Sequence, residues 1–189
     1  MVDITLISGI AIGVLVAIVG ESIVRVIVLP WYINPKLEIG DDYISGIYHS
    51  VEIINNGKSA AKRCVGSIYI EVKDPNDILH GPKEIGKTGP FVSELTPRGV
   101  EGAVCWARAG NPHSITINAY DKALLDVYAY SNEEKIISIP SELGWVTPRV
   151  YLNAKEYDGK LRITAENAKS VEKIFKLKVK GDDVIIEFK

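Results

Sequence analysis

The stretch GIYHSVEIINNG, residues 46–57, decides the fold class because its apolar positions recur at every second residue. Alternate residues of an extended chain point to opposite sides, so this spacing predicts a β-strand with one buried face. A turn is expected at Asn56-Gly57, since both residue types favour turns. The residues on the predicted buried face are Ile47, His49, Val51 and Ile53.

The same texture continues through the rest of the chain after Pro35. In CVGSIYIEVKDPND (64–77), Ile68, Ile70 and Val72 alternate before a turn at residues 74–76. Short strands separated by turns every 8–12 residues or so, without an amphipathic helix, predict an all-β fold, an immunoglobulin-like antiparallel β-sandwich. Further strands are predicted at 100–108, 114–120, 124–130, 135–139, 149–155, 160–166, 173–180 and 183–188.

Glycines mark two predicted hairpins in the C-terminal half. Asp158-Gly159 in EYDGKLRIT suits a two-residue turn with positive φ, and Gly181 is the centre of a second hairpin in LKVKGDDVIIEF. Residues 75–97, rich in proline and glycine, predict a long loop or an excursion at a sheet edge.

One segment resembles a known family. The segment YHSVEIINNGKSAAKRCVGSIYIEV (48–72) is similar to the strand–N-x-G-x-x-A–strand unit of CARDB-like, immunoglobulin-like adhesion-type modules, which are common in archaea. The resemblance implies an immunoglobulin-like fold and implies no activity, because one fold hosts many functions. The residues that carry it are Val51, Asn55, Asn56, Gly57, Ala60, Ala61, Ile68 and Ile70.

The N-terminal segment predicts a transmembrane helix. Residues 4–20 contain no charged residue, and the apolar run continues to residue 29 around Arg25. Helical geometry gives residues 4–29 a length of about 39 Å, enough to span a hydrocarbon core of about 30 Å with some tilt. A secretory signal fits poorly because MVD lacks a basic residue. We therefore expect an anchor in residues 1–32 and a β-sandwich domain in residues 33–189.

The charges near the end of this run admit two interpretations. Glu21 and Arg25 are spaced i, i+4 with the acid first, the favourable order for a pair on one helix face. The pair could lie at or just below the membrane interface, or it could contact a partner subunit inside the bilayer. Trp31 and Tyr32 follow Pro30 and are predicted to lie at the membrane boundary.

Small residues on the same helix predict a docking face. Gly9, Gly13 and Ala17 recur every four residues, and the row continues to Glu21 and Arg25. Small residues at this spacing let two helices approach closely in lipid. The predicted partners are therefore the lipid bilayer and a protein, either a second copy or another subunit, bound through this helix.

Composition excludes several function classes. The formal net charge is −2, and Lys and Arg are spread along the chain, so no nucleic-acid partner is expected. A copper site is not expected, because it needs a closely spaced Cys and His and a nearby Met. Cys105 and His113 are separated by WARAGNP, and the chain has only its initial Met. No C-x-x-C pair supports zinc. We expect no cofactor and no metal.

No motif of the sequence predicts catalysis. A G-x-S-x-G element, a P-loop and a dinucleotide fingerprint are all missing, so a non-enzymatic protein is expected. Carboxylates are scattered along the chain. Asp41-Asp42 and Asp182-Asp183 are interpreted as turn acids, with weak Ca²⁺ binding as the alternative.

A few side chains remain as candidates with alternatives. His49 is interpreted as a hydrogen-bonded core or edge histidine, with a ligand role as the alternative, whereas His80 and His113 are placed in loops. The thiols of Cys64 and Cys105 are either buried and separate or joined in a disulfide. Tyr128 and Tyr130 lie on one side of a predicted strand, and they either pack in the core or form a partner surface.

The expected function follows from the anchor and the fold. The lack of Gln and the 24% of charged residues are typical of a thermophilic source. Basic residues slightly favour a cytoplasmic sandwich, whereas adhesion-type modules usually face outward, so the side stays open. We expect a single-pass membrane-anchored β-sandwich that acts as a binding or scaffolding module, with an accessory subunit of a membrane complex as the alternative.

Overall fold

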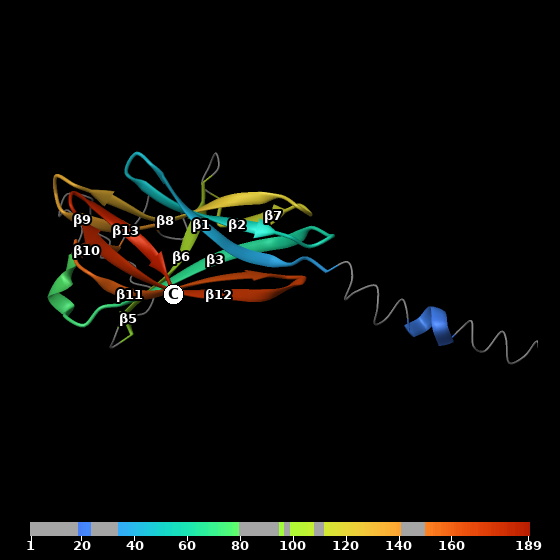
Figure 1. Cartoon of the computed structure of the whole chain (residues 1–189). Coiled ribbons are helices and arrows are strands. Elements are labelled where there is room, and N and C mark those ends of the chain that lie inside the picture. The colour runs from blue at the N-terminus through green and yellow to red at the C-terminus, as the bar shows by residue number, and fades with distance from the viewer. Residues whose placement is uncertain (1–18, 24–33, 80–94, 97–98, 108–111, 141–149) are drawn as a thin grey trace, which may run out of the picture. The chain divides into compact units, whose positions relative to one another are not determined.

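The computed structural model describes residues 19–23, 34–79, 95–96, 99–107, 112–140 and 150–189. The chain separates into two compact units, Met1–Asn34 and Pro35–Lys189. In the first unit, residues 19–23 are helical and exposed (Figure 1). No helix among the described residues combines the length and the apolar character needed to cross a bilayer.

Most of the predicted anchor lies outside the described residues. Glu21 belongs to the short helical segment, and the predicted domain boundary after residue 32 falls in the range 24–33, which is not described. The other candidate residues outside the described part of the chain are Gly9, Gly13, Ala17, Arg25, Trp31, Tyr32 and His80.

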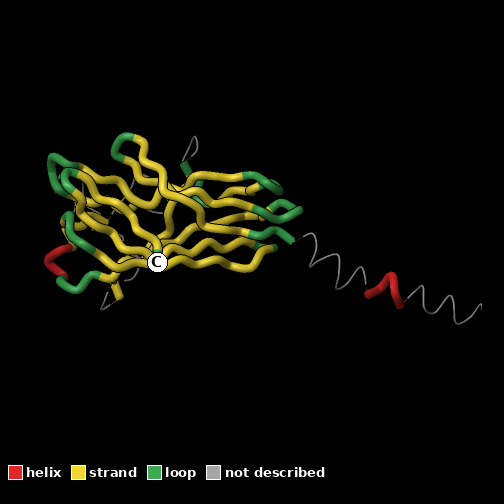
Figure 2. The backbone as a smooth tube through the Cα atoms, viewed as in Figure 1, coloured by secondary structure: helices red, strands yellow, loops and turns green. Residues whose placement is uncertain are grey.

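The second unit is built almost entirely of antiparallel strands, which confirms the predicted all-β class (Figure 2). A single 3-10 helix, η2 (Pro75–Asp77), interrupts them within the described residues of this unit. The strands are β1 (Leu37–Ser45), β2 (Tyr48–Asn55), β3 (Ala61–Glu71), β4 (Ile78–Leu79), β5 (Leu95–Thr96), β6 (Gly99–Trp106), β7 (Ser114–Ile117), β8 (Lys122–Ser131), β9 (Ile136–Ile139), β10 (Val150–Asn153), β11 (Tyr157–Ala165), β12 (Ala168–Lys180) and β13 (Asp183–Phe188).

Two sheets face each other across one core (Figure 1). Sheet A has the order β1-β2-β8-β9-β10-β4, and sheet B has the order β13-β12-β11-β3, with β7 beside β3. Strand β6 connects them, because it pairs with β3 over residues 99–104 and with β8 at Cys105 and Trp106. This arrangement fits a β-sandwich.

The predicted alternation places the core. Ile68 and Ile70 of β3 and Val51 and Ile53 of β2 are buried and belong to the same hydrophobic cluster. The sheets approach closely at Gly66, where an added Cβ would lie 2.6 Å from Cδ2 of Leu125 in the opposite sheet. Burial of such side chains is the main favourable contribution to folding.

The turns were predicted with mixed success. Gly181 has a φ of +64° in the hairpin between β12 and β13, which confirms that prediction. The Asp158-Gly159 hairpin is wrong, because both residues lie inside β11 and pair with Lys176 and Phe175 of β12. Gly159 is required there for packing, since an added Cβ would lie 2.4 Å from Cζ of Phe175.

Sequence reasoning missed the first strand. β1 contains Asp41 and Asp42, which were interpreted as turn acids, and it pairs with β2 through a bulge between Ile39 and Asp42. The hairpin turn lies instead at Gly46, which has a φ of +62°. Because a bulge interrupts the alternation of faces, β1 does not show the two-residue period that identified the other strands.

Candidate functional site

A buried polar cluster lies between the sheets, centred on His49. The histidine follows Tyr48 at the start of β2 and is 3% exposed. Residues 49 and 50 pair with residues 128 and 126 of β8, so β8 holds one extra residue, Val127, at this step. Such bulges redirect side chains and occur often at functional sites.

The two nitrogens of the His49 imidazole contact different sheets. Nδ1 lies 3.0 Å from the hydroxyl of Tyr128, whose ring stacks on the imidazole with centroids 4.3 Å apart. Nε2 lies 3.3 Å from Oδ1 of Asp183, the first residue of β13. The Tyr128 hydroxyl also lies 2.6 Å from the backbone oxygen of Val184, to which it can donate. The cluster therefore joins β2 and β8 of sheet A to β13 of sheet B.

Burial and charge act in opposite directions on this cluster. Burial lowers the pKa of His49 below its ordinary value, and the carboxylates of Asp183 and Asp42 oppose that effect without cancelling it. Burial, together with the same two carboxylates, raises the pKa of Tyr128. The tyrosine consequently stays protonated, and the histidine is neutral at neutral pH.

A second buried polar side chain, Asn55, lies at the other end of β2. Its Nδ2 donates to the backbone oxygens of Ser59, Ile117 and Asn118 at 2.8, 3.1 and 3.1 Å. Its Oδ1 accepts from the backbone N–H groups of Lys36 and Gly57, both at 3.0 Å. Asn55 thus fixes three loops at once, which is a structural role.

The thiols do not form the disulfide that the sequence left open. Cys64 and Cys105 are both buried and are not joined. Burial raises the pKa of the Cys64 thiol, which keeps it protonated and unreactive. The backbone oxygen of Cys64 instead accepts a hydrogen bond from Nε1 of the buried Trp106 at 3.1 Å.

The partner surface suggested for Tyr128 and Tyr130 is wrong, because their side chains are 0% and 5% exposed. The alternative, that they pack in the core, is confirmed. The bulge explains why alternation left the buried face of this strand open, since Val127 and Tyr128 are consecutive and both belong to the core cluster. Of the other candidates, His113 is partly buried, and Asp182 lies in the turn before β13.

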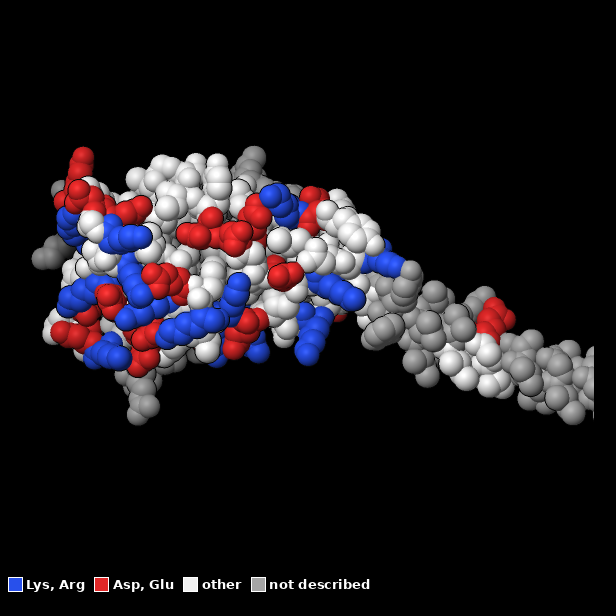
Figure 3. Space-filling view, in the orientation of Figure 1, with Lys and Arg blue, Asp and Glu red and all other residues white. Residues whose placement is uncertain are grey.

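Exposed apolar side chains gather at the tip of the β1–β2 hairpin. We define the hairpin tip as Tyr43, Ile44, Ile47 and Tyr48, which are 54%, 45%, 54% and 37% exposed. In Figure 3 a white area covers the upper part of the domain, where the tip of this hairpin lies in Figure 1, whereas blue and red alternate over β12 and β13. Sequence reasoning placed Ile47 on the buried face and so missed the tip.

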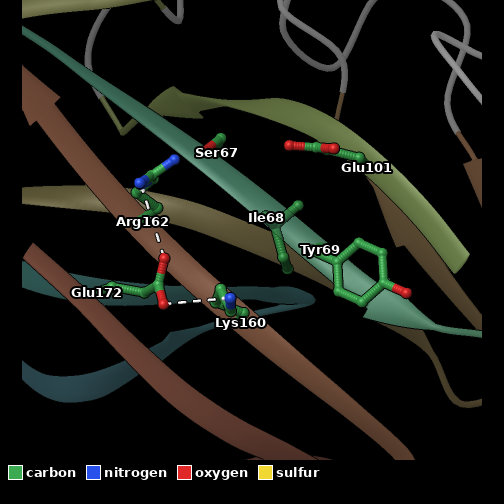
Figure 4. A pocket seen from close by; sticks show the side chains of 7 residues that line it. All are labelled: Ser67, Ile68, Tyr69, Glu101, Lys160, Arg162 and Glu172. Carbon is green, nitrogen blue, oxygen red and sulfur yellow. Dashed lines mark ion pairs between the residues drawn. The ribbon is translucent and has the colours of Figure 1, made fainter.

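The outer face of sheet B is charged and carries a shallow depression of about 260 Å³ (Figure 4). Glu172 lies 3.2 Å from Lys160 and 3.6 Å from Arg162, so one carboxylate serves both cations. With Glu101 also in the lining, two cations face two carboxylates, which leaves no surplus charge for an ionic ligand. The depression is lined by Ser67, Ile68, Tyr69, Glu101, Lys160, Arg162 and Glu172.

A search for metal ligands and three comparisons with known proteins complete the description of the site. Within the part of the chain that the structure describes, no group of three or more His, Cys, Asp or Glu side chains is placed to hold a metal ion. No protein-family model matches the chain, and neither a curated protein nor a solved structure is significantly similar to it.

Proposed function

We propose that the chain is a single-pass membrane-anchored, immunoglobulin-like module that binds a protein partner through the hairpin tip and performs no catalysis. The single observation that carries the proposal is the exposure of four large apolar side chains on one hairpin. Exposed aromatic and aliphatic side chains in a group are typical of the centre of a protein–protein interface.

The strand pairing supports an immunoglobulin-like fold. β1, β2 and β8 pair in the order A-B-E of that fold, and β3, β11 and β12 pair in the order C-F-G. β7 lies on the other side of β3, where the additional C′ strand of the immunoglobulin variable type is found. The pairs β9 with β10 and β10 with β4 then extend sheet A beyond this pattern.

A tyrosine at the start of β11 supports the same fold. Tyr157 is buried, and its hydroxyl donates to the backbone oxygen of Asn153, four residues upstream, at 2.9 Å. Immunoglobulin-like domains carry such a tyrosine corner near the start of strand F, the position that β11 takes here. Burial raises the pKa of Tyr157, so the hydroxyl keeps its proton for this bond.

The chemistry of the tip favours a protein over the lipid as its occupant. Tyrosine and isoleucine side chains, without a cationic cluster, suit an apolar protein surface better than anionic headgroups.

Site-specific cross-linking tests this proposal. A photo-cross-linking amino acid replaces Tyr43, and in a matched control it replaces Ile174, which is also exposed but lies on the charged face of sheet B. In native membranes we expect one discrete adduct from position 43, lost when Ile47→Ser is added, and none from position 174. Equal labelling at both positions, or no effect of Ile47→Ser, would contradict the proposal.

A second candidate function, an accessory subunit docked through its transmembrane helix, is favoured by the row of Gly9, Gly13 and Ala17 that continues to Glu21 and Arg25. Size analysis of the detergent-solubilised chain compares wild type with Gly13→Ile. We expect the substitution to reduce the size of the assembly if the helix docks. An unchanged size would remove the main support for this candidate.

A further inference from the structure

We propose that His49 and Tyr128 form a proton-responsive clasp between the two sheets, in which proton binding at Nδ1 of His49 redirects the Tyr128 hydroxyl from His49 to the backbone oxygen of Val184. Both acceptors are already in reach, since the hydroxyl lies 3.0 Å from Nδ1 and 2.6 Å from the Val184 oxygen. The hydroxyl has one proton, so it can donate to only one of them at a time.

With a neutral imidazole, the position of Asp183 selects the tautomer. The Asp183 carboxylate, 3.3 Å from Nε2, can only accept, so Nε2 carries the proton. Nδ1 is then unprotonated, and its lone pair accepts a hydrogen bond from the Tyr128 hydroxyl. In this state the backbone oxygen of Val184 receives no proton from the Tyr128 hydroxyl, although the two oxygens lie 2.6 Å apart.

A second proton on the ring reverses the direction of one bond. Nδ1–H now donates to the Tyr128 oxygen, and the hydroxyl proton turns to the Val184 oxygen, while Nε2–H still donates to Asp183. All three contacts are satisfied in this state, so the proton extends a continuous chain of hydrogen bonds from β2 through β8 to β13. The bound proton comes from solvent, and no bond other than N–H is made.

The groups around the imidazole set the pH range of this change. Tyr128 of β8 stacks on the ring, Asp183 of β13 faces Nε2, and Asp42 of β1 adds a second negative charge. The two carboxylates favour the imidazolium, and burial opposes it more strongly. The clasp therefore responds at a lower pH than an ordinary histidine does.

Nuclear magnetic resonance of the full chain in detergent micelles tests the clasp directly. The chain has three His, so ring nitrogen signals from labelled histidine are few. We expect Nε2–H with an unprotonated Nδ1 at neutral pH, a His49 midpoint below about 6.5, and a Val184 carbonyl shift with the same midpoint. A neutral ring protonated at Nδ1, or a Val184 carbonyl that ignores the His49 titration, overturns the proposal.

Two variants separate the clasp from a merely buried histidine. Tyr128→Phe should leave His49 titrating but abolish the coupled change at the Val184 carbonyl, and persistence of that change contradicts the mechanism. Asp183→Asn changes a side chain that is 44% exposed, so it keeps the fold. It should lower the His49 midpoint further, because the opposing charge is removed, and an unchanged midpoint would exclude the contact through Nε2.

Discussion

His49 and Asn55 lie on the same strand, β2, and both are buried polar side chains, but their hydrogen bonds differ in kind. Asn55 makes five side-chain hydrogen bonds to backbone groups, with every donor and acceptor used. His49 shares one hydroxyl proton with the backbone of another sheet. A buried side chain that has no ionisable group, such as Asn55, holds the backbone in one arrangement at any pH. A buried ionisable side chain whose neighbours compete for one proton, such as His49, can respond to pH.

The largest expected effect breaks the structural half of this comparison. Asn55→Ala removes the partners of three backbone oxygens and two N–H groups around the β2–β3 loop. Unsatisfied buried groups are expensive, so we expect the free energy of unfolding to fall by about 3–5 kcal/mol. Guanidinium unfolding followed by circular dichroism measures it, with Asn56→Ala as the control, since the Asn56 side chain donates to Glu38 at the exposed surface. Equal losses for the two variants would contradict this role of Asn55.

The next effect concerns the responsive half. His49→Phe keeps an aromatic ring against Tyr128 but removes the contacts of Nε2 with Asp183 and of Nδ1 with the Tyr128 hydroxyl. We therefore expect the free energy of unfolding to fall by about 1–2 kcal/mol at neutral pH. The variant should also change the dependence of stability on pH, which Asn55→Ala should not.

The sign of that dependence follows from the lowered pKa of His49. Burial lowers the pKa in the folded state, so the unfolded chain binds the proton first as the pH falls below about 6.5. The stability contributed by the neutral ring is present above that pH and declines down to the folded pKa. We expect His49→Phe to flatten unfolding free energies over this window. A wild-type stability that rises on acidification would contradict the assignment.

Two tyrosines sharpen the comparison at about 1 kcal/mol. The Tyr157 hydroxyl donates to the Asn153 oxygen, whereas the buried Tyr130 hydroxyl has no hydrogen-bond partner among the described residues. We expect Tyr157→Phe to cost about 1 kcal/mol and Tyr130→Phe to cost nothing or to stabilise slightly, because it removes an unpaired polar group. Thermal unfolding of both variants gives the difference, and a greater loss for Tyr130→Phe would reverse the interpretation.

The smallest effect is expected on the charged face of sheet B. Glu172→Gln removes the shared carboxylate of Lys160 and Arg162, both of which are more than 45% exposed. Ion pairs in water contribute little, so the loss should be about 0.5 kcal/mol or less and should vanish in 1 M salt. A loss as large as that for His49→Phe would show that this face is structural.

The strand pattern was predictable because burial repeats every two residues. Ile68, Ile70 and Val72 alternate and are all buried, and the strands at 136–139 and 183–188 appear close to their predicted bounds. Prediction failed where a local signal has a tertiary cause. Gly159 looks like a turn residue but lies inside β11. The position is a glycine because the ring of Phe175 occupies the space that a Cβ would need.

The sequence by itself determined the all-β class, through alternation that any buried strand must show. It also contains the apolar N-terminal run on which the proposed anchor rests. Only the tertiary structure decided that His49 meets Asp183 from 134 positions away, that Tyr128 is buried, and that Ile47 is exposed. The reason is physical: the bulges in β1 and β8 shift the register by one residue, and sheet packing, which no short segment specifies, chooses what each side chain contacts.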